Sequence, residues 1–313
     1  MRVRAKTMLT AVFGVSLAIW AAPVVSTAEP PPIPTATVTS DGRILEIVAT
    51  GAAGTDGALG DGAVVEGPAN NDQIGPLALG TNHTIIGKDN RTKVADTTSN
   101  PARMVALMTY AGSQWCTGFL VGPETLITSG HCVFNIATGT WYDPAQMTVY
   151  LGYDSSRPNP APYGSCGVRL LLSTTGWTTY HSDEYDYGGV KLTCYVGYQT
   201  GWFGWWHQSA GLNGTQSRNH GYPSDKALTQ WRSTDRIRVS EARRLYYAND
   251  TYGGNSGSPV FAKRASGASQ CAGWCVMSVH GYGLYGSYPN SSFNHGVRVN
   301  QEVSDAFFYW RAL

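Results

Sequence analysis

A histidine and a serine occupy the two segments of this sequence that are best suited to nucleophilic chemistry. His131 follows the apolar run Leu126–Thr128 and precedes Cys132. A strand end and a disulfide would hold its imidazole in one orientation, as a general base requires. Ser256 lies in Gly253-Gly-Asn-Ser-Gly-Ser-Pro259, where glycines let the backbone turn sharply and direct neighbouring N–H groups into one small space. Either segment alone is more often structural, so the two must be read together.

Asp186 supplies the third group that such a pair needs. It lies in Tyr185-Asp-Tyr-Gly-Gly-Val-Lys-Leu192, just before a short apolar run. A buried carboxylate there could accept the His131 N–H, fix the imidazole tautomer and stabilise its protonated form. The competing carboxylates are Asp183 and Glu184, which we expect to be exposed loop charges.

The order His131, Asp186, Ser256 is that of the chymotrypsin-like catalytic triad. Ser256 would attack a peptide carbonyl while His131 takes its proton, and water would later release the acyl-enzyme. We expect the backbone N–H groups of Gly254 and Ser256 to form the oxyanion hole. The loop is not the G-x-S-x-G esterase elbow, because position 258 is serine.

Short β-like runs separated by glycine and proline turns surround these segments from about residue 84 onward. The first series is Met104–Tyr110, Gly118–Val121, Thr125–Thr128, Met147–Leu151 and Gly189–Leu192. The second series is Ala227–Trp231, Ile237–Val239, Arg244–Tyr247, Pro259–Ala262, Val276–His280 and Gly296–Val299. This pattern favours an all-β fold of the sandwich or barrel type. Only the C-terminus is helical in pattern, with Asn300 as cap and Val303, Ala306, Phe307 and Trp310 on one face.

The N-terminus is typical of an exported protein. A basic start precedes an apolar stretch, Met8–Val25, and small residues end at Ala28, so we expect a signal peptide over residues 1–28 and a secreted, extracellular enzyme. A transmembrane anchor is the alternative, which Pro23 and the cleavage-like site disfavour. The net charge is +1 and no long basic run occurs, which argues against a nucleic-acid partner.

Residues 29–83 have the composition of a pro-segment, rich in proline, glycine, alanine and acidic residues. Such a segment buries little apolar area and cannot offset the chain entropy of folding alone. Its seven acids against one arginine could dock on the basic remainder, or it could be a solvated spacer. The sequence thus predicts a signal peptide (1–28), a pro-segment (29–83) and a serine protease domain (84–313).

Six cysteines, all beyond residue 115, would be oxidised in an exported chain. Spacing favours three bridges, the second by elimination: Cys116–Cys132, Cys166–Cys194 and Cys271–Cys275. A zinc site competes weakly, because no C-x-x-C pair faces a second ligand pair. We expect no metal and no cofactor.

Taken together, these motifs resemble those of the glutamyl endopeptidases, the bacterial Glu-specific branch of the chymotrypsin-like serine proteases. The matching stretches, through most of residues 84–311, are Ile86–Thr92, Cys116–Gly118, Val121–Pro123, Gly130–Cys132, Tyr185–Gly188, Gly221–Lys226, Asp250–Pro259 and Val279–His280. The resemblance implies two six-stranded antiparallel β-barrels, at about 100–195 and 200–300, and a C-terminal helix over 300–311. His131 and Asp186 would come from the first barrel and Ser256 from the second. It also implies that Cys116–Cys132 and Cys271–Cys275 are family bridges, with Cys166–Cys194 an addition.

The resemblance further implies a pocket for a substrate glutamate built from Thr251 and His280. A protonated His280 imidazole would donate to the carboxylate, so the preference for glutamate would weaken as pH rises. An ordinary core histidine is the alternative. Residue 255 is asparagine, which cannot form the ion pair with a new N-terminus that activates trypsin-like zymogens. The mature terminus would lie near Thr84, after His83, or follow a cut at Glu66.

The expected partners are protein or peptide substrates and, before processing, the chain's own pro-segment, with no membrane partner. We expect a monomer. Two alternatives remain: an endopeptidase of broader specificity, and a catalytically inactive barrel that serves as a binding module.

Overall fold

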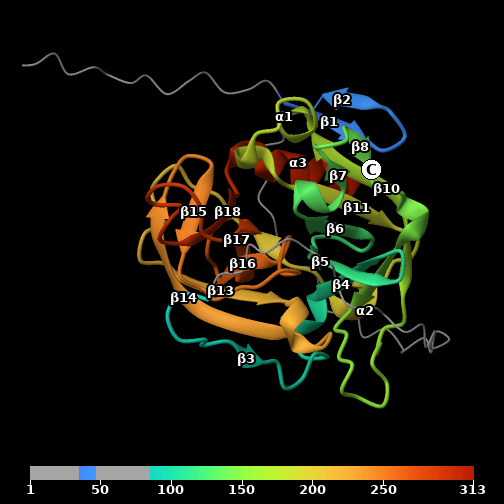
Figure 1. The fold of residues 1–313 in the computed structure, drawn as a ribbon, viewed down its shortest axis with the longest axis horizontal. Coiled ribbons are helices and arrows are strands. Elements are labelled where there is room, and N and C mark those ends of the chain that lie inside the picture. The colour runs from blue at the N-terminus through green and yellow to red at the C-terminus, as the bar shows by residue number, and fades with distance from the viewer. Residues whose placement is uncertain (1–34, 47–84) are drawn as a thin grey trace, which may run out of the picture. The chain divides into compact units, whose positions relative to one another are not determined.

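The computed structural model describes residues 35–46 and 85–313. Six strands form the first barrel, in the order β11 (Gly188–Leu192), β6 (Thr125–Thr128), β5 (Ser113–Leu120), β4 (Val105–Tyr110), β9 (Met147–Leu151) and β10 (Cys166–Thr174). Pairing of β10 with β11 closes it. The second barrel runs β17 (Gly273–Tyr282), β16 (Pro259–Arg264), β13 (Gln216–Gly221), β14 (Trp231–Ser240), β15 (Arg244–Tyr247) and β18 (Asn294–Arg298). Pairing of β18 with β17 closes it. The prediction of two six-stranded antiparallel barrels is confirmed (Figure 1).

Short elements decorate the barrels. The short strands are β1 (Ala36–Thr39) and β2 (Ile44–Glu46) beside β10, β3 (Thr92–Lys93) beside β14, β12 (Gly204–Trp205) beside β17, and the ribbon β7 (Phe134–Asn135) with β8 (Thr140–Trp141). The helices are α1 (Thr175–Thr178), α2 (Gly197–Thr200) and α3 (Gln301–Ala312). The single-turn 3₁₀ helices are η1 (Ala102–Met104), η2 (Gly130–Cys132), η3 (Pro144–Gln146), η4 (Asp183–Tyr185) and η5 (Ser224–Lys226). No helix among the described residues is long and apolar enough to cross a membrane.

The C-terminal helix forms as its sequence predicts. The Asn300 side chain accepts a hydrogen bond of 3.0 Å from the Val303 N–H, which satisfies a donor left free in the first helical turn. The four residues expected on one face of α3 are all fully buried. Trp205 donates to Ser304 across 2.9 Å, so the aromatic segment between the barrels and α3 pack on one another.

Two expectations about strands need correction. Residues 227–230 form a turn rather than a strand, because Ala227 and Leu228 have positive φ angles of 48° and 57°, and β14 begins only at Trp231. Conversely, β10 and β13 were not expected. The β13 sequence Gln-Ser-Arg-Asn-His-Gly lacks apolar alternation, but Ser217 and Asn219 are buried and satisfied by side-chain hydrogen bonds to Asn249 and Ser258.

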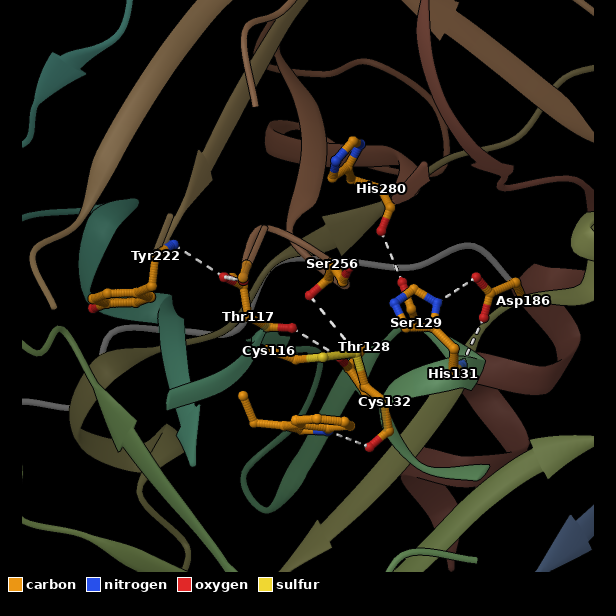
Figure 2. Close-up of a disulfide and its surroundings, with 12 residues drawn as sticks. Cys116, Thr117, Thr128, Ser129, His131, Cys132, Asp186, Tyr222, Ser256 and His280 are labelled. Atoms are coloured by element: carbon orange, nitrogen blue, oxygen red, sulfur yellow. Dashed lines mark hydrogen bonds and ion pairs between the residues drawn. A yellow bond between two sulfur atoms is a disulfide. The ribbon is translucent and has the colours of Figure 1, made fainter. Parts of the chain in front are cut away.

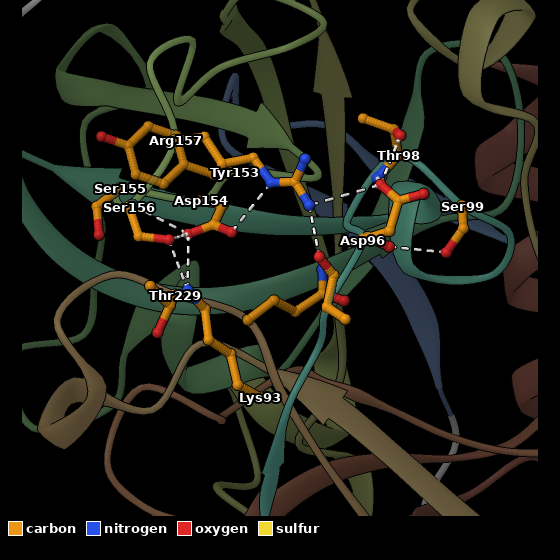
Figure 3. A network of polar contacts seen from close by, with 12 residues as sticks. Lys93, Asp96, Thr98, Ser99, Tyr153, Asp154, Ser155, Ser156, Arg157 and Thr229 are labelled. Carbon is orange, nitrogen blue, oxygen red and sulfur yellow. Dashed lines mark hydrogen bonds and ion pairs between the residues drawn. The ribbon is translucent and has the colours of Figure 1, made fainter.

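A polar network joins the loop after β9 to the segment Lys93–Ser99 and to Thr229, which lies just before β14 (Figure 3). The Asp154 carboxylate is 2% exposed and accepts hydrogen bonds from the Ser156 backbone and hydroxyl. It also pairs with Lys93 at 3.4 Å, and its backbone bridges to Thr229. Burial opposes its charge, but these bonds hold the pKa of Asp154 below the usual range.

The predicted signal peptide and the candidate processing points at Glu66 and His83–Thr84 lie outside the described residues. Within the predicted pro-segment the structure describes residues 35–46, which form the β1–β2 hairpin. In this hairpin, β1 pairs with β10 at the C-terminal end of that strand.

Candidate active site

The structure brings His131 and Asp186 into direct contact (Figure 2). His131 lies in the turn η2 that follows β6, and Asp186 follows the turn η4. The Asp186 carboxylate accepts from the His131 backbone N–H and faces its Nδ1, each at 2.7 Å. Asp186 is fully buried, whereas the His131 side chain is 30% exposed. Burial opposes the imidazolium, but the negative charge of Asp186 and its hydrogen bond prevail and raise the pKa of His131.

A disulfide holds the turn that carries His131. Cys132 in η2 is bonded to Cys116 in β5, and the Trp115 indole donates to the Cys132 carbonyl at 2.9 Å. Cys166 is bonded to Cys194 and Cys271 to Cys275, so the structure contains the three pairs expected from the spacing.

The Ser256 loop requires its glycines. Gly254 and Gly257 have φ angles of +94° and +83°, where a side chain is strained. A Cβ at Gly257 would also overlap Thr128 Oγ1. The N–H groups of Asn255, Gly257 and Ser258 are all paired with backbone carbonyls. Among the described residues no acceptor takes up the N–H of Gly254 or of Ser256, so these two donors are available to a ligand.

Thr117 on β5 joins the serine loop to the first barrel, and sequence reasoning did not single it out. Its hydroxyl donates to the Gly254 carbonyl at 2.7 Å and accepts from the Tyr222 N–H at 3.0 Å. Its own N–H donates to the Ser256 carbonyl at 2.9 Å. A buried threonine thus fixes the carbonyls of two loop residues, one of them Ser256 (Figure 2).

A cleft of about 660 Å³ contains His131 and Ser256 in its wall. The other lining residues are Trp115, Phe134, Asn135, Ile136, Tyr142, Trp177, Asp183, Tyr252, Gly253, His280, Gly281, Tyr282 and Gly283. Aromatic rings make up much of this wall, and none of the described lining residues is lysine or arginine. Any cationic donor from the lining residues would therefore have to be a histidine.

His280 lies on β17, lines this cleft and is 4% exposed. Burial, with the nearby positive charges of His295 and His131, lowers the pKa of His280 to about 3. The unliganded imidazole is therefore neutral at ordinary pH, whereas the sequence predicted a protonated form that donates to a bound glutamate. Thr251 is 2% exposed but is not among the residues that line the cleft.

Tyr247 on β15 fixes the tautomer of His280, a role that sequence reasoning missed. The Tyr247 hydroxyl lies 2.8 Å from His280 Nδ1, and burial raises the tyrosine's pKa well above its usual value. If Nδ1 carried the proton, the buried tyrosine O–H would have no acceptor among residues 35–46 and 85–313. The satisfied arrangement has Tyr247 donating to Nδ1, which leaves Nε2–H as the donor of His280.

Known proteins are similar to this chain in sequence and in fold. The family model described as Trypsin matches residues 89–301. A glutamyl endopeptidase of Bacillus licheniformis is 39% identical over 230 residues, which are 73% of this chain and 69% of that protein. The chain belongs to the glutamyl endopeptidase family. It is therefore a serine endopeptidase with the trypsin-like fold. A solved structure of a Glu endopeptidase in complex with MPD agrees with a TM-score of 0.64 at 28% identity, covering 74% of this chain and 100% of that one.

A further relative bears a different functional name. An extracellular metalloprotease of Bacillus subtilis is 35% identical over 234 residues, 72% of this chain and 69% of that protein. In residues 35–46 and 85–313, the sole group of His, Cys, Asp and Glu atoms close enough together to hold a metal is Cys116, His131 and Cys132. Both sulfurs belong to one disulfide and cannot act as thiolate ligands, so this group does not fit a metal centre.

Proposed function

We propose that this family member is a secreted endopeptidase that cleaves after glutamate, with Ser256 as nucleophile, His131 as general base and Asp186 as the group that orients it. The observation that carries the proposal is the His131–Asp186 pair in the same cleft as Ser256. The carboxylate favours the tautomer with Nδ1–H, which leaves Nε2 to take the serine proton. The unpaired N–H groups of Gly254 and Ser256 would then stabilise the oxyanion.

Cleavage after glutamate is supported by the similarity to the Bacillus licheniformis glutamyl endopeptidase and to the solved Glu endopeptidase, and by the donor of His280. The substrate carboxylate needs donors, because burying it unpaired is costly. A neutral His280, oriented by Tyr247, would donate from Nε2 to that carboxylate. Thr251, which is buried and adjoins the lining residue Tyr252, would donate a second, neutral hydrogen bond to the same carboxylate.

Export and processing complete the proposal. Residues 1–28 would direct secretion, residues 29–83 would precede the mature enzyme, and the mature protease domain would begin near Thr84 and act as a monomer. N-terminal sequencing of the secreted enzyme tests this organisation. A secreted enzyme with Glu29 as its only N-terminus would contradict the pro-segment.

The activity is tested by mapping cleavage sites in a mixed peptide library by mass spectrometry. We expect cuts after glutamate, and labelling of Ser256 by a serine-reactive phosphonate that Ser256→Ala abolishes. Cuts without a glutamate preference would show an endopeptidase of broader specificity. The absence of both cuts and labelling would show an inactive barrel.

A further inference from the structure

The β1–β2 hairpin precedes the protease domain in sequence but belongs to its first sheet (Figure 1). Strand β10 pairs with β9 only at Cys166 and Gly167, so the rest of that edge lacks β9. Strand β1 takes the vacant edge, pairing Thr37, Val38 and Thr39 with residues 174, 173 and 172. The barrel itself is already closed by β10 and β11. The hairpin therefore adds a seventh and an eighth strand from outside the closed ring.

Backbone and hydroxyl groups at both ends of β1 fit this edge. The Ser40 N–H donates to the Leu171 carbonyl at 2.9 Å, and the Leu171 N–H donates to the Ser40 hydroxyl at 3.0 Å. At the other end the Ala36 N–H donates to the Thr175 hydroxyl at 3.0 Å. Because alternate residues of a strand face the same neighbour, the N–H of Val38, between Ala36 and Ser40, also faces β10.

Two threonines of β1 are fully buried in the interface. Thr37 and Thr39 are both 0% exposed, and the Thr37 hydroxyl accepts a hydrogen bond of 2.8 Å from the Trp310 indole of α3. Trp310 is itself fully buried, and its ring lies 5.5 Å from that of Tyr187, the residue after Asp186. Removal of β1 would take this acceptor away from the Trp310 indole N–H.

Charge contributes little to this docking. The Asp41 and Arg43 side chains pair with each other at 3.0 Å in the hairpin turn and are about half exposed. The one charged group of the protease domain that contacts the hairpin by a described hydrogen bond is Glu302, which accepts from the Thr35 hydroxyl. Within residues 35–46 the interface is thus a strand addition with buried hydroxyls rather than a contact between acidic and basic groups.

We infer that residues 35–46 form a lasting edge strand of the protease domain and stay bound, without a covalent link, after the chain is cut anywhere from residue 47 to the bond between His83 and Thr84. The processed enzyme is then a two-chain protein. This goes beyond the proposed activity and rests only on the docking contacts, because the cut is made experimentally below.

The test uses the full chain with Ser256→Ala, which prevents self-digestion, and a recognition sequence for an unrelated protease inserted between residues 47 and 83. After cutting, size-exclusion chromatography is run at 0.1 M and about 1 M NaCl, where the Debye length falls to about 3 Å. We expect both fragments to elute together at both salt concentrations and to separate only in denaturant. Separate elution at low salt would overturn the inference, and separation only at high salt would show docking by charge. A failure of the proposed specificity would leave this result unchanged.

Matched variants identify the contacts that matter. Val38→Pro removes the central N–H that faces β10, whereas Ile44→Pro places the same residue in β2 at a 70% exposed position whose N–H faces away from β1. We expect release of the cut segment in the first and retention in the second. Thr37→Val keeps the shape but removes the acceptor of Trp310, and we expect the segment to dissociate about tenfold more readily or worse. Retention in both Val38→Pro and Thr37→Val would contradict the inference.

Discussion

Replacing His280 by leucine removes the donor that we propose for a substrate glutamate, while keeping a buried side chain on β17. A hydrogen bond to a charged group contributes about 1.5–3 kcal/mol, which corresponds to about 10- to 150-fold in kcat/KM. We expect a loss of this size for a glutamate peptide and little change for a matched phenylalanine peptide. Tyr247→Phe keeps the imidazole but frees its tautomer. For Tyr247→Phe we expect kcat/KM for the glutamate peptide to fall by the contribution of one neutral hydrogen bond. This is about 0.5–1.5 kcal/mol, or roughly two- to tenfold.

The pH dependence follows from the depressed pKa of His280, about 3 in the empty cleft. A bound carboxylate would raise that pKa, because its negative charge favours the imidazolium. We expect the burial of His280 to outweigh this effect, so that the imidazole stays neutral at pH 6 and above. The ratio of kcat/KM for glutamate over glutamine should therefore stay constant from pH 6 to 8.5, rather than fall as the sequence alone suggested.

The assay compares peptides that differ only at the residue before the cut, Glu, Gln, Asp or Phe, on wild type, His280→Leu and Tyr247→Phe. Ratios between substrates cancel the titration of His131, which affects all of them. A glutamate preference that falls about tenfold across pH 6–8 would refute the neutral imidazole. An undiminished preference in His280→Leu would refute the pocket itself, and the triad would survive either result.

Three further predictions concern the triad and the buried histidines. Ser256→Ala should keep its fold and its three disulfides but lose about 10⁶-fold in kcat, measured by peptide hydrolysis. Asp186→Asn should lose about 10⁴-fold, and its acid limb of kcat/KM should move to lower pH, because the charge that raises the pKa of the base is gone; an unmoved limb would contradict that cause. The free energy of unfolding should fall as the pH drops from about 6.5 to 4. Each histidine that is buried and neutral in the folded chain contributes up to about 1.4 kcal/mol per pH unit to this fall. The three histidines with pKa values lowered to about 3 or 4 are His220, His280 and His295. In the unfolded chain these histidines bind protons that they do not bind in the folded chain. In denaturation experiments, the free energy of unfolding of His220→Leu should therefore depend less steeply on pH than that of the wild type.

The sequence predicted the structure best at sites where the chemistry requires an unusual local backbone conformation. The glycines around Ser256 are needed because positive φ angles and close approach exclude side chains there, and such demands leave a readable pattern. The C-terminal helix was equally legible, because its cap and its period are both local features.

The features that the sequence did not predict depend on contacts between segments that are distant in the chain. Strand β13 is polar in sequence because its buried side chains are satisfied by residues about 30 to 40 positions away. Tyr247 reaches His280 because β18 pairs with both β15 and β17, and no local pattern encodes that neighbourhood. The pKa of His280 likewise follows from burial beside two other histidines.

The three-residue motif Cys116-Thr-Gly118 on β5 shows how one strand constrains both the turn of His131 and the loop of Ser256. Cys116 is bonded to the turn of His131, and Gly118 lets β6, which leads into that turn, approach closely, since a Cβ there would overlap Leu126. Thr117 points to the opposite face of the strand and holds the carbonyls of Gly254 and Ser256. Because successive residues of one strand constrain the histidine turn and the serine loop, a shift of either relative to the other must break a disulfide or two buried hydrogen bonds. Strand β5 therefore constrains the position of the serine loop relative to the histidine turn.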